Sequence, residues 1–130
     1  NIKDLRYFLL IILQGQLFQG GIDPADSRRN IERILQAASE AHVPVLLVGM
    51  QAPGNFGPEY KAAFDAIYPE LAAEYGTVYA ESFLAPVVAA PDLRAVMQAD
   101  GIHPNADGVA LIVEALGPAV EALVTRVQQP

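Results

Sequence analysis

Residues 43–50, VPVLLVGM, decide the fold that this sequence predicts. The stretch is apolar almost throughout and shows no alternation with polar residues, which is typical of a strand covered on both faces. Such strands belong to parallel sheets that carry helices on both sides. The loop after it, residues 51–58 (QAPGNFGP), is rich in Gly, Pro and Asn and therefore ends the strand.

Upstream of this strand, the sequence predicts another strand and a helix. Residues 7–13 (YFLLIIL) form an unbroken apolar run that is much too short to span a bilayer, and we interpret it as a strand. A helix is expected to begin at Asp23-Pro24, with Asp as its cap and Pro in its first turn, and to end near His42. Its buried face, at helical spacing, is predicted to comprise Ile31, Ile34, Leu35 and Ala38.

Downstream, the same alternation continues. A second helix carrying Pro69 is followed by a short strand at residues 77–80 and by a broken helix and loop at residues 83–97. The apolar positions of that second helix are Tyr60, Phe64, Ile67 and Leu71. A final helix follows His103-Pro104 and should bend at Gly117-Pro118. Its predicted apolar face comprises Val109, Ile112, Val113, Leu116, Val120, Leu123, Val124 and Val127.

Strands that alternate with helices at this spacing predict right-handed crossovers and a parallel sheet with helices on its faces. With 130 residues the chain is expected to form one α/β domain. In such sheets chemistry belongs on the loops beyond the carboxyl ends of the strands. The loops at 14–21, 51–58 and 98–105 all follow that rule and should converge.

Composition excludes several classes of function. The formal charge is -7 and the eight Lys and Arg residues form no basic cluster, which argues against nucleic-acid binding. The chain has no cysteine, so it offers no disulfide, thiolate metal site or cysteine nucleophile, and this fits either redox compartment.

The motif Asp100-Gly101-Ile102-His103 is the strongest local candidate for chemistry. An acid three residues before a histidine in a tight turn can bind the imidazole Nδ1–H and stabilise the imidazolium that forms when Nε2 accepts a proton. On spacing alone, however, this short motif is more often a solvated turn or a helix cap. A metal site is the other alternative, because Asp100, His103, Asn105 and Asp107 offer oxygen and nitrogen ligands, which His42 could join. The spacing does not match an EF-hand.

Two longer stretches carry a resemblance to a known family. DGIHPNADG, together with VPVLLVGMQAPGNFGPEYKAAFDAIYPELAAEYG, resembles the SGNH (GDSL) hydrolases, in particular the bacterial arylesterase and multifunctional thioesterase/lysophospholipase branch. The likeness begins near Gly21 and continues into the final helix. The resemblance implies a flavodoxin-like three-layer α/β/α sandwich and a serine esterase that hydrolyses small carboxylic esters or thioesters without a cofactor.

The resemblance also implies roles for individual residues. His103 would be the general base and Asp100 its orienting acid. Met50, Pro53, Phe56 and Tyr60 would be expected near the acyl chain of the substrate, with ordinary packing as the alternative for each. In the oxyanion-hole block of the form Gly-x-Asn-Asp, Gly15 matches the glycine, and Gln16 stands at the asparagine position.

The serine nucleophile of the family has no counterpart in this chain. The three serines are Ser27, Ser39 and Ser82, and no Gly-Asp-Ser block surrounds any of them. Ser27 is expected on the surface of the first helix, by the preference of Ser for helix starts. Ser39 falls late in the same helix, and Ser82 follows a strand. We assign none of the three as nucleophile.

These differences lead to three expectations about the whole chain. It resembles the C-terminal portion of an esterase whose N-terminal strands and nucleophile block are missing. The strand at residues 7–13 would then be an unpaired apolar edge, which favours a homo-oligomer formed through that strand. The alternative to an active esterase is an inactive module that keeps the fold and binds acyl groups or serves a structural role.

Overall fold

The computed structural model describes residues 10–12 and 22–129 of the chain. Within these residues the sheet has three parallel strands, β1 (Leu10–Ile12), β2 (Val45–Val48) and β3 (Val78–Ala80), in the order β1-β2-β3. Leu46 of β2 pairs with Ile11 of β1 on one side and with Val78 of β3 on the other. The parallel sheet that the alternation predicts is therefore confirmed.

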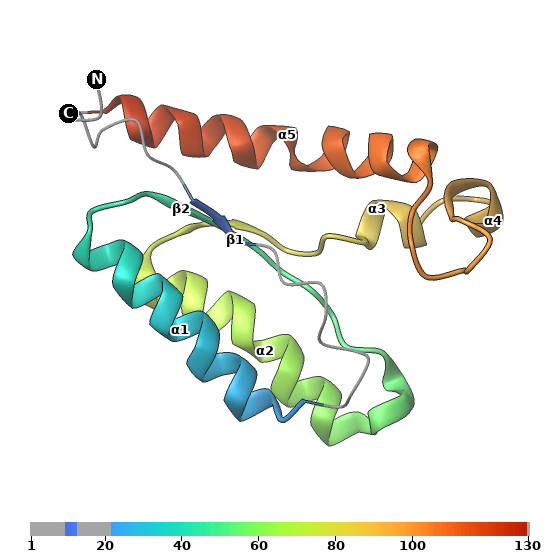
Figure 1. The fold of residues 1–130 in the computed structure, drawn as a ribbon, viewed down its shortest axis with the longest axis horizontal. Coiled ribbons are helices and arrows are strands. Elements are labelled where there is room, and N and C mark those ends of the chain that lie inside the picture. The colour runs from blue at the N-terminus through green and yellow to red at the C-terminus, as the bar shows by residue number, and fades with distance from the viewer. Residues whose placement is uncertain (1–9, 13–21, 130) are drawn as a thin grey trace.

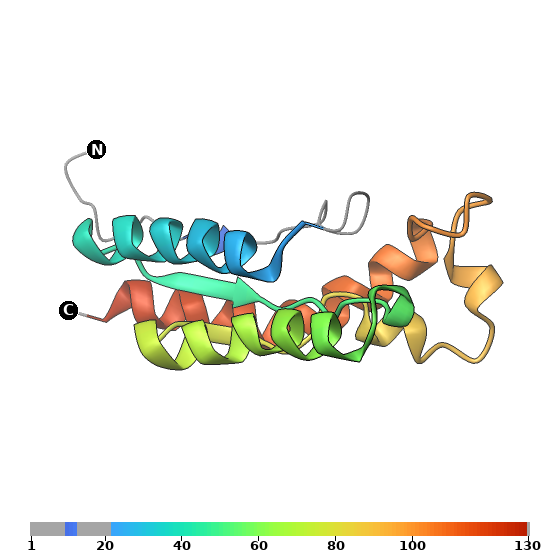
Figure 2. The ribbon, with the colours of Figure 1, turned by 90° about the horizontal axis from the view of Figure 1, so that it is seen from below.

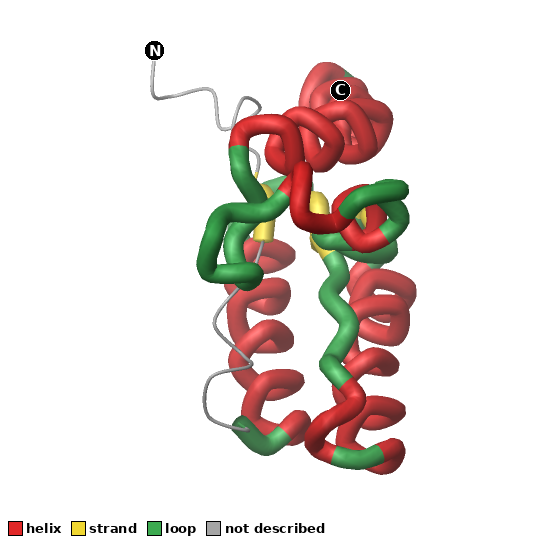
Figure 3. Tube along the Cα trace, turned by 90° about the vertical axis from the view of Figure 1, so that its right-hand side faces the viewer, coloured by secondary structure: helices red, strands yellow, loops and turns green. Residues whose placement is uncertain are grey.

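The helices form a layer on each face of this sheet (Figure 1). Helices α1 (Pro24–Glu40) and α2 (Pro58–Tyr75) cover one face, and α5 (Ala106–Gln128) covers the other. Figure 3 shows the strands end-on between α5 and the α1–α2 pair. In Figure 2, seen from below, α1 and α2 run beside each other in front of α5. The three-layer α/β/α architecture is therefore confirmed.

β2 supplies the centre of the core because both of its faces are covered. Val45 and Leu47 pack with α1 and α2, in a cluster that includes Ile31 and Phe64. Leu46 and Val48 pack on the opposite face, where Leu123 of α5 meets them. All four strand residues are buried. This explains why residues 43–50 lack the alternation of a strand with one solvated face.

The start of α1 follows the capping chemistry expected from its sequence. The Asp23 carboxylate accepts a hydrogen bond from the backbone N–H of Ala25 at 2.9 Å, and Pro24 occupies the first turn. Ile31, Leu35 and Ala38 are buried as predicted, whereas the prediction for Ile34 is wrong, since 45% of it is exposed. The face that α1 turns to the core is thus narrower than the pattern suggests.

The expected surface position of Ser27 is also wrong. Only 1% of this residue is exposed, and its hydroxyl has no hydrogen-bond partner among the described residues. The reason is its register, because Ser27 precedes the buried Ile31 by one helical turn and therefore lies on the same face. The preference of Ser for helix starts does not report which face of the helix it occupies.

The remaining elements connect the layers. α2 is preceded by a short helix, η2 (Gly54–Phe56), and continues through Pro69 to Tyr75. The expected broken helix consists of two single turns, α3 (Ala85–Val88) and α4 (Leu93–Val96). Residues 7–9 and 13 of the predicted first strand, and Gly15 and Gln16, lie outside the described residues.

The apolar face predicted for α5 is partly wrong. Ile112, Leu123 and Val127 are buried, whereas Val109, Val113 and Val124 are exposed. The helix packs against β2, β3 and the two short helices, and this contact covers a narrower arc than eight apolar positions span. By length and composition alone, α5 is also apolar enough to cross a membrane, although its buried side chains pack on the sheet. The helix continues through Gly117 and Pro118.

The packing of α5 on β2 predicts a large stability difference between two positions on one helix. Leu123→Ala should lower the free energy of unfolding by about 2–5 kcal/mol, because it leaves a cavity against Leu46 and Val48. Val113→Ala, at a position that is 64% exposed, should change it by no more than about 0.5 kcal/mol. Urea titrations followed by circular dichroism measure both, and equal losses would contradict this account of the core.

Candidate active site

The loop between α4 and α5 is closed by short-range hydrogen bonds. Met97 and Pro104 form an isolated antiparallel bridge across its base. The backbone N–H of Gln98 donates to the His103 carbonyl at 2.7 Å, and the Gln98 side chain donates to the Pro104 carbonyl at 3.1 Å. The loop therefore has a defined shape before any ligand is considered.

Within this loop, the Asp100 carboxylate binds His103 through both of its oxygens. Oδ1 accepts the backbone N–H groups of Ile102 and His103 at 2.9 and 3.0 Å. Oδ2 lies 2.6 Å from the imidazole Nδ1. Gly101 makes this turn with a φ of 66°, in the left-handed region that favours glycine. The structure thus brings together the acid and the histidine that the motif predicts.

This contact sets the protonation chemistry of the pair. The hydrogen bond from the His103 ring, followed by those from the backbone N–H groups of His103 and Ile102, lowers the pKa of Asp100 from 3.8 to about 2. Asp100 is therefore an anion at neutral pH. An anion at Nδ1 keeps the proton on that nitrogen, which leaves Nε2 as the basic atom. The imidazole is 64% exposed, and its Nε2 has no hydrogen-bond partner within the described part of the chain.

Asn105 and Gly108 hold this loop in place, and the sequence did not predict that role for either of them. The Asn105 side chain caps α5 through the N–H of Gly108 at 3.0 Å and donates to the carbonyls of Ala95 and Met97. A Cβ at Gly108 would lie 2.2 Å from the Val96 carbonyl oxygen, so only glycine permits this approach. A glycine in the first turn of a helix is a weak signal of such a contact, because it is otherwise unfavourable there.

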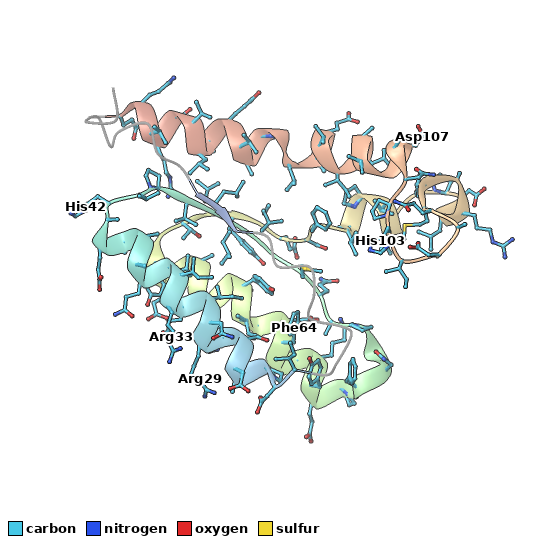
Figure 4. All side chains as sticks on the ribbon, viewed as in Figure 1. Arg29, Arg33, His42, Phe64, His103 and Asp107 are labelled. Atoms are coloured by element: carbon cyan, nitrogen blue, oxygen red, sulfur yellow. The ribbon has the colours of Figure 1, made fainter. Side chains whose placement is uncertain are left out.

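The two histidines do not form one site. Figure 4 shows His42 at the end of the molecule opposite His103. Asp107 follows in the first turn of α5, and the Asn105 amide is engaged in capping the helix. No group of three or more His, Cys, Asp or Glu side chains suited to a metal ion occurs among residues 10–12 and 22–129.

A cavity of about 650 Å³ lies beyond the carboxyl end of β2. One wall follows the strand and the other comes from α3. Its lining residues are Met50, Gln51, Ala52, Pro53, Lys61, Ser82, Leu84, Ala85, Val88 and Ala89. Of the four residues expected near an acyl chain, Met50 and Pro53 therefore line it. Phe56 and Tyr60 instead contact each other, with ring centroids 5.0 Å apart, and the Tyr60 hydroxyl donates to the Ile22 carbonyl. The α3 wall was missed because a single helical turn carries no recognisable pattern.

The cavity wall and the Asp100–His103 loop are connected by one apolar cluster. Val87 of α3, Val96 of α4 and Ile112 of α5 are buried against one another. The two short helices thus fix the position of the loop relative to the α3 wall of the cavity. Neither Ser82, which lines the cavity, nor Ser27 or Ser39 forms a hydrogen bond with the His103 ring in the described structure.

Comparison with known proteins identifies the family. The model of the GDSL-like lipase/acylhydrolase family matches residues 18–111. The chain belongs to this family. The match includes the cavity loop and the Asp100–His103 pair, so the SGNH (GDSL) resemblance drawn from these stretches is confirmed.

Individual GDSL family members resemble the chain over most of its length. It is 33% identical over 119 residues to thioesterase 1/protease 1/lysophospholipase L1 of Escherichia coli strain K12, covering 92% of this chain and 56% of that relative. The crystal structure of TesA superposes with a TM-score of 0.76 at 32% identity, covering 94% of this chain and 66% of the other. AlinE4, an SGNH-hydrolase family esterase, superposes with a TM-score of 0.64 at 38% identity, covering 88% of this chain and 59% of the other. The chain thus spans just over half the length of the curated relative that it matches.

The geometry of the pair predicts a shifted titration of Asp100. Its carboxyl signal in carbon-detected NMR should have a midpoint near pH 2, and His103→Ala should move that midpoint up toward 3.8 by removing the largest cause of the shift. Because the pKa is lowered in the folded protein, the stability that the pair contributes is present above 3.8 and is lost as the pH falls toward 2. An unchanged midpoint in His103→Ala would show that the ring contact does not hold the carboxylate.

Proposed function

We propose that this protein acts in the hydrolysis of carboxylic esters or thioesters, with His103 as the general base and Asp100 as the acid that orients it. The observation that supports the proposal is the 2.6 Å contact between Asp100 Oδ2 and His103 Nδ1, with Nε2 left free and exposed. In acyl transfer to a serine, this nitrogen accepts the hydroxyl proton and later returns it to the leaving alcohol or thiol. Membership of the GDSL family supports the same reaction class.

The roles of the two residues follow from charge. When Nε2 accepts the proton, the imidazole becomes a cation, and the Asp100 carboxylate at Nδ1 stabilises it. Asp100 does not take up a proton in this step, in line with its lowered pKa. The family supplies the nucleophile from a Gly-Asp-Ser block, and we assign that role to none of Ser27, Ser39 and Ser82. Gly15 and Gln16 stay predictions for the oxyanion hole.

The cavity beside the sheet is the proposed acyl site. Its walls are largely aliphatic, with Met50, Leu84 and Val88 among them, and its volume is within the range of small-molecule sites. An acyl chain buried there would gain affinity with each methylene that leaves water. The substrate class proposed is therefore a small ester or thioester with an aliphatic acyl group.

The alternative is a module that binds acyl groups without turning them over. One observation favours it: none of the three serines, all within the described residues, is hydrogen-bonded to His103. The two functions share the cavity and differ only in turnover, so an activity assay separates them.

The activity test uses p-nitrophenyl butyrate and both histidines of the chain. If the protein is an esterase, His103→Ala should lower kcat/KM by about 10²–10⁴ because the general base is lost. His42→Ala is the matched control and should leave the rate unchanged, since His42 lies at the opposite end of the molecule. Turnover that survives His103→Ala would overturn the proposed role of the pair. A protein that binds alkyl ligands but has no turnover would support the module.

We also propose that the protein forms homo-oligomers through β1. β1 is an edge strand of the sheet formed by the described residues, and it pairs with β2 on one side. An apolar edge strand is a template for pairing with another chain. Sedimentation velocity at micromolar concentration should show a dimer or larger species that dissociates on dilution. A single monomeric boundary across that range would contradict the proposal.

A further inference from the structure

The loop that forms one wall of the cavity is held by an ion pair on α2. Lys61 and Asp65 lie one helical turn apart, and their charged groups are 2.8 Å apart. The Lys61 ammonium also donates to the Ala52 carbonyl at 2.7 Å, and Asp65 Oδ1 accepts the Ala52 N–H at 2.7 Å. Both backbone polar groups of Ala52 are thus bound by the two side chains of one pair.

The Lys61–Asp65 pair supplies backbone hydrogen bonds to Ala52 just beyond the point where the sheet ends. The ladder of β2 ends at Val48, and the last backbone bonds to β3 and the segment beyond it are those of Gly49. Ala52 is only 3% exposed, so its N–H and carbonyl need partners that water does not readily supply. Lys61 and Asp65 provide those partners, and Lys61 and Ala52 both line the cavity.

The geometry points to Lys61 and Asp65 as the positioning residues that set which acyl chains the cavity accepts. This inference rests on the proposed function only in taking the cavity as the acyl site. The pair fixes the Ala52 wall opposite α3, which contributes Leu84, Ala85 and Val88. A fixed wall gives the cavity a definite length and width, whereas a loosened wall yields to longer chains.

The effect of a fixed wall can be expressed as a profile of affinity against chain length. Each methylene that enters an apolar site contributes about fourfold in affinity until the site is full. A rigid cavity should therefore show a steep rise followed by an abrupt stop. Releasing Ala52 should remove the stop, because the wall moves outward when a longer chain presses on it.

The experiment measures binding of a neutral alkyl series, the primary alcohols from butan-1-ol to dodecan-1-ol, by calorimetry. Neutral ligands are chosen so that a charge change at Lys61 does not itself alter binding. We expect the native protein to prefer one chain length. Selectivity is the ratio of the affinity for the preferred alcohol to the affinity for the alcohol two methylenes longer. We expect Lys61→Met to lower this ratio by about tenfold, which is somewhat less than the full contribution of two methylenes.

Further variants separate positioning from general stability. Asp65→Asn keeps an oxygen for the Ala52 N–H but removes the charge that holds Lys61, so it should cause the same loss of selectivity even if Lys61→Met folds poorly. The double variant should be no worse than either single one, because the two side chains act as a unit. Glu70→Gln is the matched control, because it breaks the ion pair between Glu70 of α2 and Arg28 of α1, and Glu70 is not among the residues lining the cavity. It should keep the native profile.

The outcomes distinguish this inference from the proposed function. Selectivity that is lost in Lys61→Met and Asp65→Asn but kept in Glu70→Gln supports the inference, whether or not the protein hydrolyses esters. An unchanged profile in folded Lys61→Met, additive losses in the double variant, or no alcohol binding to the native protein would each overturn it. If the protein hydrolyses esters, the same variants should shift KM across acyl chain lengths while kcat for the preferred chain stays within about twofold, because neither residue contacts the reacting atoms.

Discussion

The burial of β2 between two helical layers is the constraint on which the rest of this structure depends. Leu47 packs toward α1 and α2, while Leu46 packs toward Leu123 of α5. A strand buried in this way must be central and parallel, so its carboxyl end points to the same edge as those of its neighbours. The cavity wall begins two residues after this strand, at Met50. The position of the proposed acyl site is thus a consequence of core packing, before any catalytic residue is considered.

The opposite wall and the Asp100–His103 loop depend on a smaller packing unit. Val87, Val96 and Ile112 join α3, α4 and the first half of α5. The contact of Gly108 with the Val96 carbonyl brings the start of α5 against α4, so the loop between them must close tightly. The Met97–Pro104 bridge and the Asn105 cap then leave little freedom for the residues between them. The geometry of the pair is therefore local in sequence but anchored by packing.

The sequence predicted the parts of this molecule that repeat a pattern or are local. The central strand, the capped start of α1 and the spacing from Asp100 to His103 each depend on residues close together in the chain. The sequence-based prediction was wrong where burial depends on how much of a helix surface the neighbouring elements cover. Ile34 and Val113 have helical spacing but lie beyond the contact area, and Ser27 is buried because of its register. The α3 wall and the Lys61–Ala52 contact join separate segments, so no local pattern could show them.

The loop sets the orientation of the His103 ring, but the exposure of the ring shows that the loop does not shield Nε2 from water. The bond to Asp100 fixes the tautomer and the direction of the ring within the loop. General-base catalysis also requires the proton donor to lie within hydrogen-bond reach of Nε2 and away from competing water. An imidazole that is 64% exposed meets neither requirement by itself. In the proposed hydrolysis, turnover therefore depends on a hydroxyl being placed within reach of Nε2, while this loop sets the orientation in which Nε2 would accept the proton.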